Sequence, residues 1–119
     1  MRGLHLQAEP QPEAKLVRAT RGRVFDVAVD LRPGSPTYCA WTAVELDADR
    51  RNALYIPAGC AHGFLSLVDD SEVAYLMSAP YVADLARTYR WNDPAFAIAW
   101  PTAPALISDR DAAAADFRR

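Results

Sequence analysis

The chain is poor in lysine, histidine and cysteine, and it has no long apolar run. Lys15 is its only lysine among 13 basic residues, and its 2 histidines are His5 and His62. No apolar stretch approaches the roughly 20 residues of a membrane-spanning helix, and no secretory signal opens the chain. We therefore expect a cytoplasmic protein without a membrane partner, in which the 2 cysteines, Cys39 and Cys60, are reduced thiols.

An excess of positive charge is also missing. The net charge is −2 and the pI is about 5.6, which argues against a nucleic-acid partner because such proteins present a basic stripe. A composition of 51% hydrophobic and 24% charged residues is that of a globular protein, not of a disordered one. The length of 119 residues predicts a single domain over 1–119.

What the chain does have is alternation of apolar and polar residues between turn signals. In the clearest strand, 23–31, four apolar residues share one face, whereas Asp26 and Asp30 lie on the other. Short strands separated by such turns predict an all-β sandwich or barrel. The expected strands are 15–20, 23–31, 41–46, 53–57, 63–68 and 72–77. A helix is expected over 108–117, because capping residues precede a run of alanines.

The two histidines are the first candidates for chemistry, since imidazole exchanges protons near neutral pH. His5 shares a strand face with Gln7, and Gly3 suits a bulge that would bring Arg2 to the same site. Taken alone, His5 is more often a structural strand histidine. His62 follows a proline-glycine turn, so it either lines the mouth of a barrel or completes the turn.

The residues give less support to a catalytic metal site or to a cysteine nucleophile. A catalytic metal site in a β-barrel needs about three histidine or carboxylate ligands, and two distant histidines predict none. Cys60 and His62 could face the same way as a nucleophile and base, but a packed thiol is the favoured interpretation. From its position alone, Tyr75 is predicted to be a core tyrosine of a strand. Asp111 is predicted to be an acid that complements a helix dipole.

Several strings, taken in order along nearly the whole chain, resemble the dTDP-4-dehydrorhamnose 3,5-epimerase family, a cupin-like jelly roll. The strings are Arg2-Gly3-Leu4-His5-Leu6-Gln7, Lys15-Leu16-Val17-Arg18, Gly22 to Asp30, Ser35-Pro36-Thr37, Ile56-Pro57 to His62-Gly63-Phe64, and Arg90-Trp91-Asn92-Asp93-Pro94 to Trp100-Pro101. The resemblance implies a cupin-like jelly-roll sandwich with a short C-terminal helix. It also implies a domain that lacks the family's N-terminal arm.

The resemblance implies a cofactor-independent isomerase that acts on a dTDP-linked 4-keto-6-deoxyhexose in deoxysugar biosynthesis. Protons next to the C4 ketone, at C3 and C5, would be removed and returned on the opposite face. By resemblance His5 is the catalytic base, Asp111 its carboxylate partner, Tyr75 the proton donor and Lys15 the cation near the sugar oxygens.

By the same resemblance four further residues contact the substrate: Arg2, Gln7, His62 and Arg110. The chain departs from the family's usual residues at Leu6, Cys39, Cys60, Leu76 and Ala86. A truncated or degenerate jelly-roll module that binds a sugar nucleotide without turnover is therefore the alternative to an active epimerase. We expect a homodimer, because a barrel without its leading strands would expose sheet edges.

Overall fold

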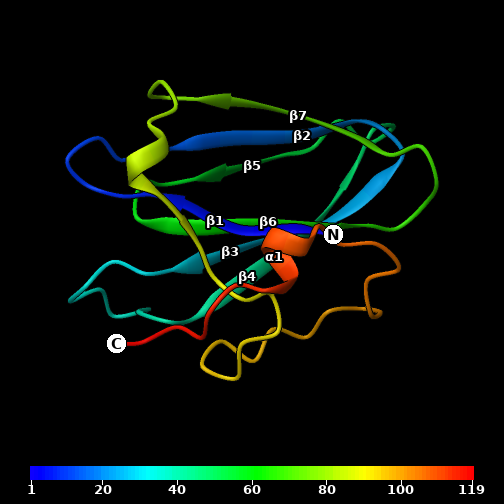
Figure 1. The fold of residues 1–119 in the computed structure, drawn as a ribbon. Coiled ribbons are helices and arrows are strands. Elements are labelled where there is room, and N and C mark those ends of the chain that lie inside the picture. Colours follow the sequence, from blue (N-terminus) through cyan, green and yellow to red (C-terminus); the bar gives the residue numbers. More distant parts are fainter.

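The computed structural model describes residues 1–119, which form two facing antiparallel sheets (Figure 1). The larger sheet has the strand order β4–β3–β6–β1–β8, and the smaller one has the order β5–β2–β7. The strands are β1 (Arg2–Gln7), β2 (Lys15–Arg21), β3 (Arg23–Asp30), β4 (Trp41–Asp47), β5 (Ala53–Ile56), β6 (Cys60–Ser66), β7 (Glu72–Met77) and β8 (Ala86–Thr88). The prediction of an all-β jelly-roll sandwich is confirmed.

Strand β3 shows why the sequence folds into three layers. Its residues Val27 and Val29 pack on one face, against the C-terminal segment, residues 89–119, which crosses the larger sheet. Its residue Val24 packs on the other face, between the two sheets. Both faces are buried, so Asp26, predicted on the face opposite the apolar stripe, lies inside the sandwich with no exposed surface.

Two apolar clusters follow from this layering. One lies between the sheets and is built from Val17, Ala19, Val24, Leu46, Ile56 and Cys60. The other lies between the larger sheet and the C-terminal segment and is built from Leu4, Val27, Val29, Leu31, Cys39, Ala61 and Phe96. Aromatic rings of the C-terminal segment, including Trp100 and Phe117, complete the second cluster. The C-terminal segment therefore acts as the third layer of the domain.

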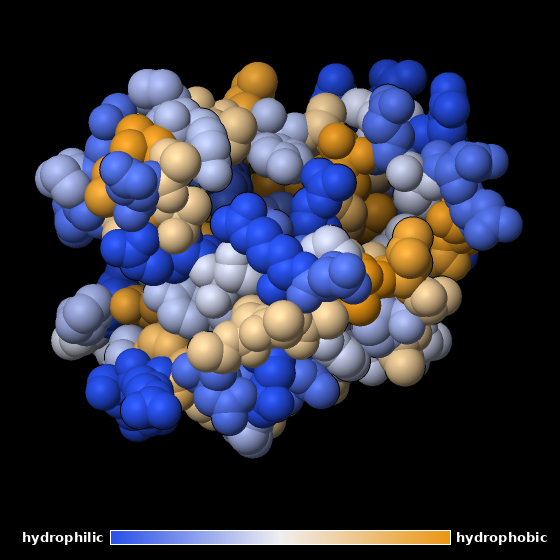
Figure 2. Space-filling view, in the orientation of Figure 1, coloured by the Kyte–Doolittle hydropathy of each residue, from blue (hydrophilic) through white to orange (hydrophobic).

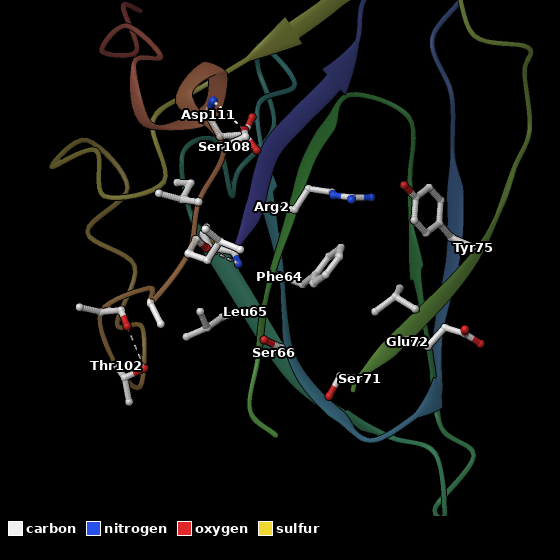
Figure 3. A pocket seen from close by; sticks show the side chains of 16 residues that line it. Arg2, Phe64, Leu65, Ser66, Ser71, Glu72, Tyr75, Thr102, Ser108 and Asp111 are labelled. Atoms are coloured by element: carbon white, nitrogen blue, oxygen red, sulfur yellow. Dashed lines mark hydrogen bonds between the residues drawn. The ribbon is translucent and has the colours of Figure 1, made fainter. Parts of the chain in front are cut away.

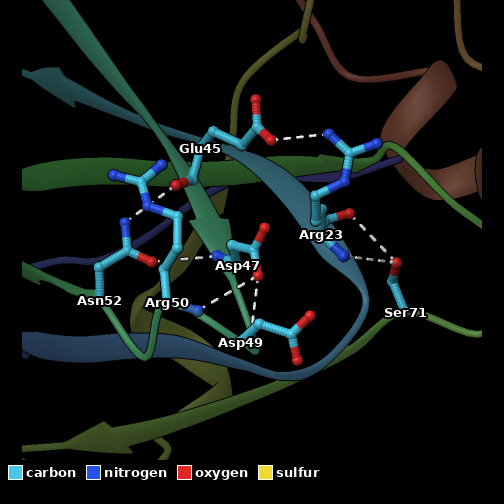
Figure 4. Close-up of polar contacts among 7 residues, drawn as sticks. All are labelled: Arg23, Glu45, Asp47, Asp49, Arg50, Asn52 and Ser71. Carbon is cyan, nitrogen blue, oxygen red and sulfur yellow. Dashed lines mark hydrogen bonds and ion pairs between the residues drawn. The ribbon is translucent and has the colours of Figure 1, made fainter.

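Polar turns close the strands where the sequence predicts them. Between β4 and β5, Asp47 Oδ1 accepts hydrogen bonds from the amides of Asp49 and Arg50, at 2.8 and 3.3 Å (Figure 4). The side chain of Asn52 accepts from the Asp47 amide and donates to the Glu45 carbonyl. An aspartate and an asparagine thus satisfy backbone groups that the turn leaves unpaired.

Three details differ from the sequence expectations. Helix α1 spans only Asp109–Ala112, with Ser108 as its N-cap, instead of 108–117. It ends early because the chain must turn to place Phe117 in the second apolar cluster. Strand β6 spans Cys60–Ser66 instead of 63–68, so His62 lies within the strand and does not complete the turn before it. Strand β8 was not expected, since its three residues carry no alternation.

The structure contains no helix with the length and apolar character that a membrane span requires.

Strands β1 and β6 approach each other closely at two glycines. The register shifts between Arg2 and His5, as expected for a bulge at Gly3, whose φ is +117°. A Cβ on Gly63 would lie 2.8 Å from Leu4 Cδ2 and 2.9 Å from the Arg2 carbonyl oxygen. The bulge therefore needs glycine on both strands, and it sets the position of His5.

We predict that Gly63→Ala destabilises the domain by about 1–3 kcal/mol, the usual cost of overpacking a well-packed core. The new methyl group would push β1 away from β6. Urea unfolding measures the loss. Ser66→Ala, at an exposed position of the same strand, is the control and should change stability by less than about 0.5 kcal/mol. Equal stability of the two variants would contradict the close approach.

Candidate active site

Side chains from both sheets meet in a cavity of about 250 Å³ at one end of the sandwich. The predicted site residues among its lining are His5, Gln7, Lys15, Tyr75 and Arg110. His5 comes from the larger sheet, whereas Lys15 and Tyr75 come from the smaller one, so the cavity exists only because the sheets face each other. The molecular surface is hollowed beside α1, where hydrophilic side chains gather (Figure 2).

His5 and Asp111 form a hydrogen-bonded pair, although they are 106 positions apart. His5 Nε2 lies 2.8 Å from Asp111 Oδ1. An ionised carboxylate can only accept a hydrogen bond, so Nε2 carries the proton and the lone pair is on Nδ1. The aspartate thereby selects one tautomer of the imidazole and fixes the plane of the ring.

Asp111 stays ionised because its hydrogen bonds outweigh its burial. Burial by itself raises the pKa of Asp111. Hydrogen bonds with His5, the Gly3 amide and the Ser108 cap, together with the His5 charge, lower the pKa by more than burial raises it. The pKa of Asp111 therefore falls below the ordinary aspartate value. The Gly3 amide donates to Oδ2 at 3.1 Å. The bulge of β1 therefore serves the carboxylate as well as the histidine.

Tyr75 lies between this cavity and a larger one of about 840 Å³. Arg2 lines the larger cavity, and its guanidinium carbon lies 6.0 Å from the centre of the Phe64 ring. Figure 3 shows Arg2 and Tyr75 pointing toward each other across this space. Asp111 also lines it, so the His5–Asp111 pair stands between the two cavities. The structure thus brings Arg2 close to the other predicted site residues.

His62 is buried next to Tyr75 and forms a second histidine–aspartate pair. His62 Nε2 lies 2.6 Å from Asp26 Oδ1, and the rings of His62 and Tyr75 meet edge to face at 6.1 Å. His62 is also the cross-strand partner of His5. Sequence reasoning missed Asp26, although it shares its strand face with the apolar Val24, which marks a buried acid.

Gln7 and Lys15 also have polar partners within the chain, whereas Cys60 is packed among apolar side chains. The Gln7 amide donates to the carbonyl groups of Gln11 and Pro80 and accepts from the Val82 amide, so it ties the loops beside the cavity together. Lys15 is buried, with Nζ 3.4 Å from Glu13 Oε1. Cys60 packs between the sheets, and burial raises the pKa of its thiol, which keeps it protonated.

Sequence reasoning did not single out three residues that line the smaller cavity. These are Glu13, Tyr81 and Arg87. Glu13 lies in a loop and Arg87 in the short strand β8, where no periodicity marks a face. Tyr81 is largely exposed. Residues in loops and in very short strands can be assigned to a site only once the fold shows what lies opposite them.

The family model for dTDP-4-dehydrorhamnose 3,5-epimerase matches residues 1–119. Curated relatives of that name include the proteins of Mycolicibacterium smegmatis, 51% identical over 115 residues, and Sinorhizobium fredii, 48% identical over 112 residues. The matches cover 96% and 93% of this chain, but 56% and 57% of the relatives. The chain thus spans little more than half the length of these proteins.

Solved structures agree with the sequence relatives. The rmlC epimerase of Mycobacterium tuberculosis superimposes with a TM-score of 0.93 at 47% identity, covering 97% of this chain and 59% of that one. NovW of Streptomyces spheroides, a 4-keto-6-deoxy sugar epimerase, gives 0.92 at 43%, covering 97% and 58%. The chain therefore belongs to the dTDP-4-dehydrorhamnose 3,5-epimerase family.

Proposed function

We propose that this chain epimerises a nucleotide-linked 4-keto-6-deoxy sugar of the dTDP-4-dehydro-6-deoxyglucose type, without a cofactor. The observation that carries the proposal is the His5–Asp111 pair beside a cavity that Lys15 and Tyr75 also line. The names and ligands of similar structures support it. One, from Legionella pneumophila, is a complex with dTDP-4-keto-L-rhamnose, and one from Bacillus anthracis holds TDP and PPi.

In the proposed reaction, His5 Nδ1 removes a proton from the carbon next to the C4 ketone. The C–H electron pair forms a carbon–carbon double bond, and the carbonyl electrons move to oxygen as an enolate. His5 becomes an imidazolium, which the ionised Asp111 at 2.8 Å stabilises. The burial of Asp111 strengthens this interaction because the carboxylate is shielded from water.

Tyr75 returns a proton to the same carbon from the opposite side, because it reaches the cavity from the other sheet. Lys15 provides the positive charge that the enolate oxygen needs, and a preorganised charge in a buried site is a large source of rate acceleration. After the reaction the His5 imidazolium gives its proton to solvent and the Tyr75 phenolate takes one from solvent, so both residues return to their starting states. The net change is inversion at carbon, with no redox step.

The remaining candidates would bind the substrate. Arg2 lies in the larger cavity and Arg110 in the smaller, and guanidinium groups suit phosphate oxygens. His62 is buried and lines neither cavity, so it would act on the sugar through its contact with Tyr75, while Gln7 would act mainly through the loops that it holds. We place the reaction in a reducing compartment, the cytoplasm, because both cysteines are free thiols.

The first test is deuterium incorporation from D₂O at C3 and C5 of a dTDP-4-keto-6-deoxyhexose. We expect exchange by the wild-type chain, and a decrease of about 10²–10⁴-fold in His5→Ala and in Tyr75→Phe, the range for a lost acid or base. Mass spectrometry or proton NMR measures the label. Tyr55→Phe, an exposed tyrosine remote from the cavity, should exchange like the wild type.

Absence of exchange above the His5→Ala level would overturn the epimerase proposal. Calorimetric titration with dTDP would then identify the alternative, a jelly-roll module that binds the nucleotide without turning over its sugar. Exchange that survives in His5→Ala would instead assign the base to another residue.

A second test uses pH. The pKa of Asp111 is lowered in the folded state, so its contribution to stability is present above the ordinary value of about 3.9. That contribution is lost as the pH falls through the lower folded value. We therefore expect Asp111→Asn to be less stable than the wild type by about 1–3 kcal/mol at neutral pH. Urea unfolding should show the difference shrinking below about pH 4; a constant difference would contradict the role of the charge.

We further propose that the chain forms a homodimer through the outer face of the smaller sheet. Leu16 lies directly between Tyr55 and Leu76 in the strand register, and these side chains are 44%, 63% and 73% exposed. An apolar row of this kind on a soluble sheet marks an interaction surface. The alternative surface for the dimer contact is a free edge of the smaller sheet, formed by β5 on one side and β7 on the other.

Light scattering tests the dimer. We expect a mass of twice the 13.1 kDa of the chain, and a shift toward the monomer in Leu76→Asp, because a charge within an apolar contact disfavours association. Leu106→Asp, an equally drastic change at a residue that is 82% exposed elsewhere, should remain dimeric. A monomeric wild-type chain would overturn this proposal without affecting the epimerase proposal.

A further inference from the structure

We propose that Glu13 and Lys15 together recognise an α-hydroxy ketone: Lys15 contacts the carbonyl oxygen, and Glu13 accepts a hydrogen bond from the hydroxyl group on the adjacent carbon. The inference rests on the proposed function and extends it to Glu13, a loop residue just before β2. In this arrangement the hydroxyl-bearing side of the ketone faces the smaller sheet, because Glu13 lies close to the start of β2.

The first observation is that two opposite charges lie buried side by side. The side chains of Glu13 and Lys15 are 9% and 7% exposed, and Glu13 Oε1 lies 3.4 Å from Lys15 Nζ. Lys15 opens the central strand of the smaller sheet, paired with Ile56 on one side and Met77 on the other, so its backbone is held firmly. Removing two charges from water is costly unless further partners satisfy them.

The second observation is that both groups still have unused hydrogen-bonding capacity. Glu13 Oε2 is buried without a partner, and Lys15 Nζ makes only the 3.4 Å ionic contact. Both residues line the cavity that holds His5 and Tyr75. The other buried atoms without a partner belong to Asp26 and Arg90, and neither residue lines that cavity. Glu13 is therefore the unsatisfied acceptor that a ligand in this cavity would meet.

The chemistry of the pair defines the ligand. A carboxylate only accepts hydrogen bonds and an ammonium group only donates them. Placed side by side, they complement a hydroxyl group and a carbonyl oxygen on neighbouring carbons. A phosphate would be repelled by Glu13, so the diphosphate belongs near Arg87 and Arg110, which line the same cavity.

In a 4-keto-6-deoxy sugar only one hydroxyl group is adjacent to the ketone. C5 carries the ring oxygen and the methyl group, so the adjacent hydroxyl is on C3. Glu13 would therefore hold the C3 hydroxyl while Lys15 contacts the C4 oxygen. This orientation makes Glu13 a specificity residue that reads a group beside the reacting carbons.

The test compares two substrates, the dTDP-4-keto-6-deoxyhexose and its 3-deoxy analogue, by deuterium incorporation at C5, which both possess. For the wild type we expect kcat/KM to fall by about 10–100-fold when the 3-hydroxyl is removed, as for a hydrogen bond to a charged acceptor. In Glu13→Ala the two substrates should differ by less than about threefold. In Glu13→Gln the difference should be intermediate, because a neutral acceptor oxygen remains.

The ratio separates recognition from a structural role. If Glu13 only held Lys15 in place, Glu13→Ala would slow both substrates equally and leave the wild-type ratio, which would overturn the inference. Glu9→Ala removes an exposed acid from the same loop and should keep the wild-type ratio. If Glu13→Ala does not fold, as judged by circular dichroism, an undiminished ratio in Glu13→Gln overturns the inference. Failure of the wild type to exchange either substrate refutes the proposed function instead.

Discussion

The contact between Asp111 and β1 is the interaction on which the rest of the site depends. One carboxylate oxygen accepts from His5 and the other from the Gly3 amide, so a residue near the C-terminus fixes both the ring and the bulge beneath it. Ser108 caps the single turn of α1 and so orients Asp111 in turn. A short helix has little stability of its own; here the contacts of Asp111 hold it against the sheet.

The layering of the domain explains how so many polar side chains can be buried near one another. Apolar clusters lie on both faces of the larger sheet, and they carry most of the stability that burial provides. Six of the polar side chains near the site form three pairs, His5 with Asp111, His62 with Asp26, and Lys15 with Glu13. Pairing limits the cost of burying each charge, and among the buried atoms left without a partner only Glu13 Oε2 belongs to a residue that lines the smaller cavity.

Sequence patterns predicted the strands from β2 to β7 because alternation and turn signals mark them locally, whereas β8 carries no alternation and was not predicted. Turn residues such as Asp47 and Asn52 act on backbone groups within a few positions, so they too could be predicted. The end of α1 could not, because alanine favours a longer helix and the chain leaves it to bury Phe117 beside Phe96. The start of β6 was likewise expected too late, at residue 63, because the residues directly before it include no β-branched side chain, and pairing with β3 extends the strand to Cys60.

The candidate residues His5, Lys15, Tyr75 and Asp111 could be named from the sequence by their types and by the strings around them. Local patterns were sufficient for the fold class, whereas the kind of chemistry was expected only from the resemblance to a known family, because the residue types alone favoured structural roles. Only the tertiary structure decided that Asp111 contacts Nε2 of His5, that Asp26 holds His62, and that Glu13 lies beside Lys15. These relations join residues from different strands and loops, and their distances depend on how two sheets and a C-terminal segment pack together.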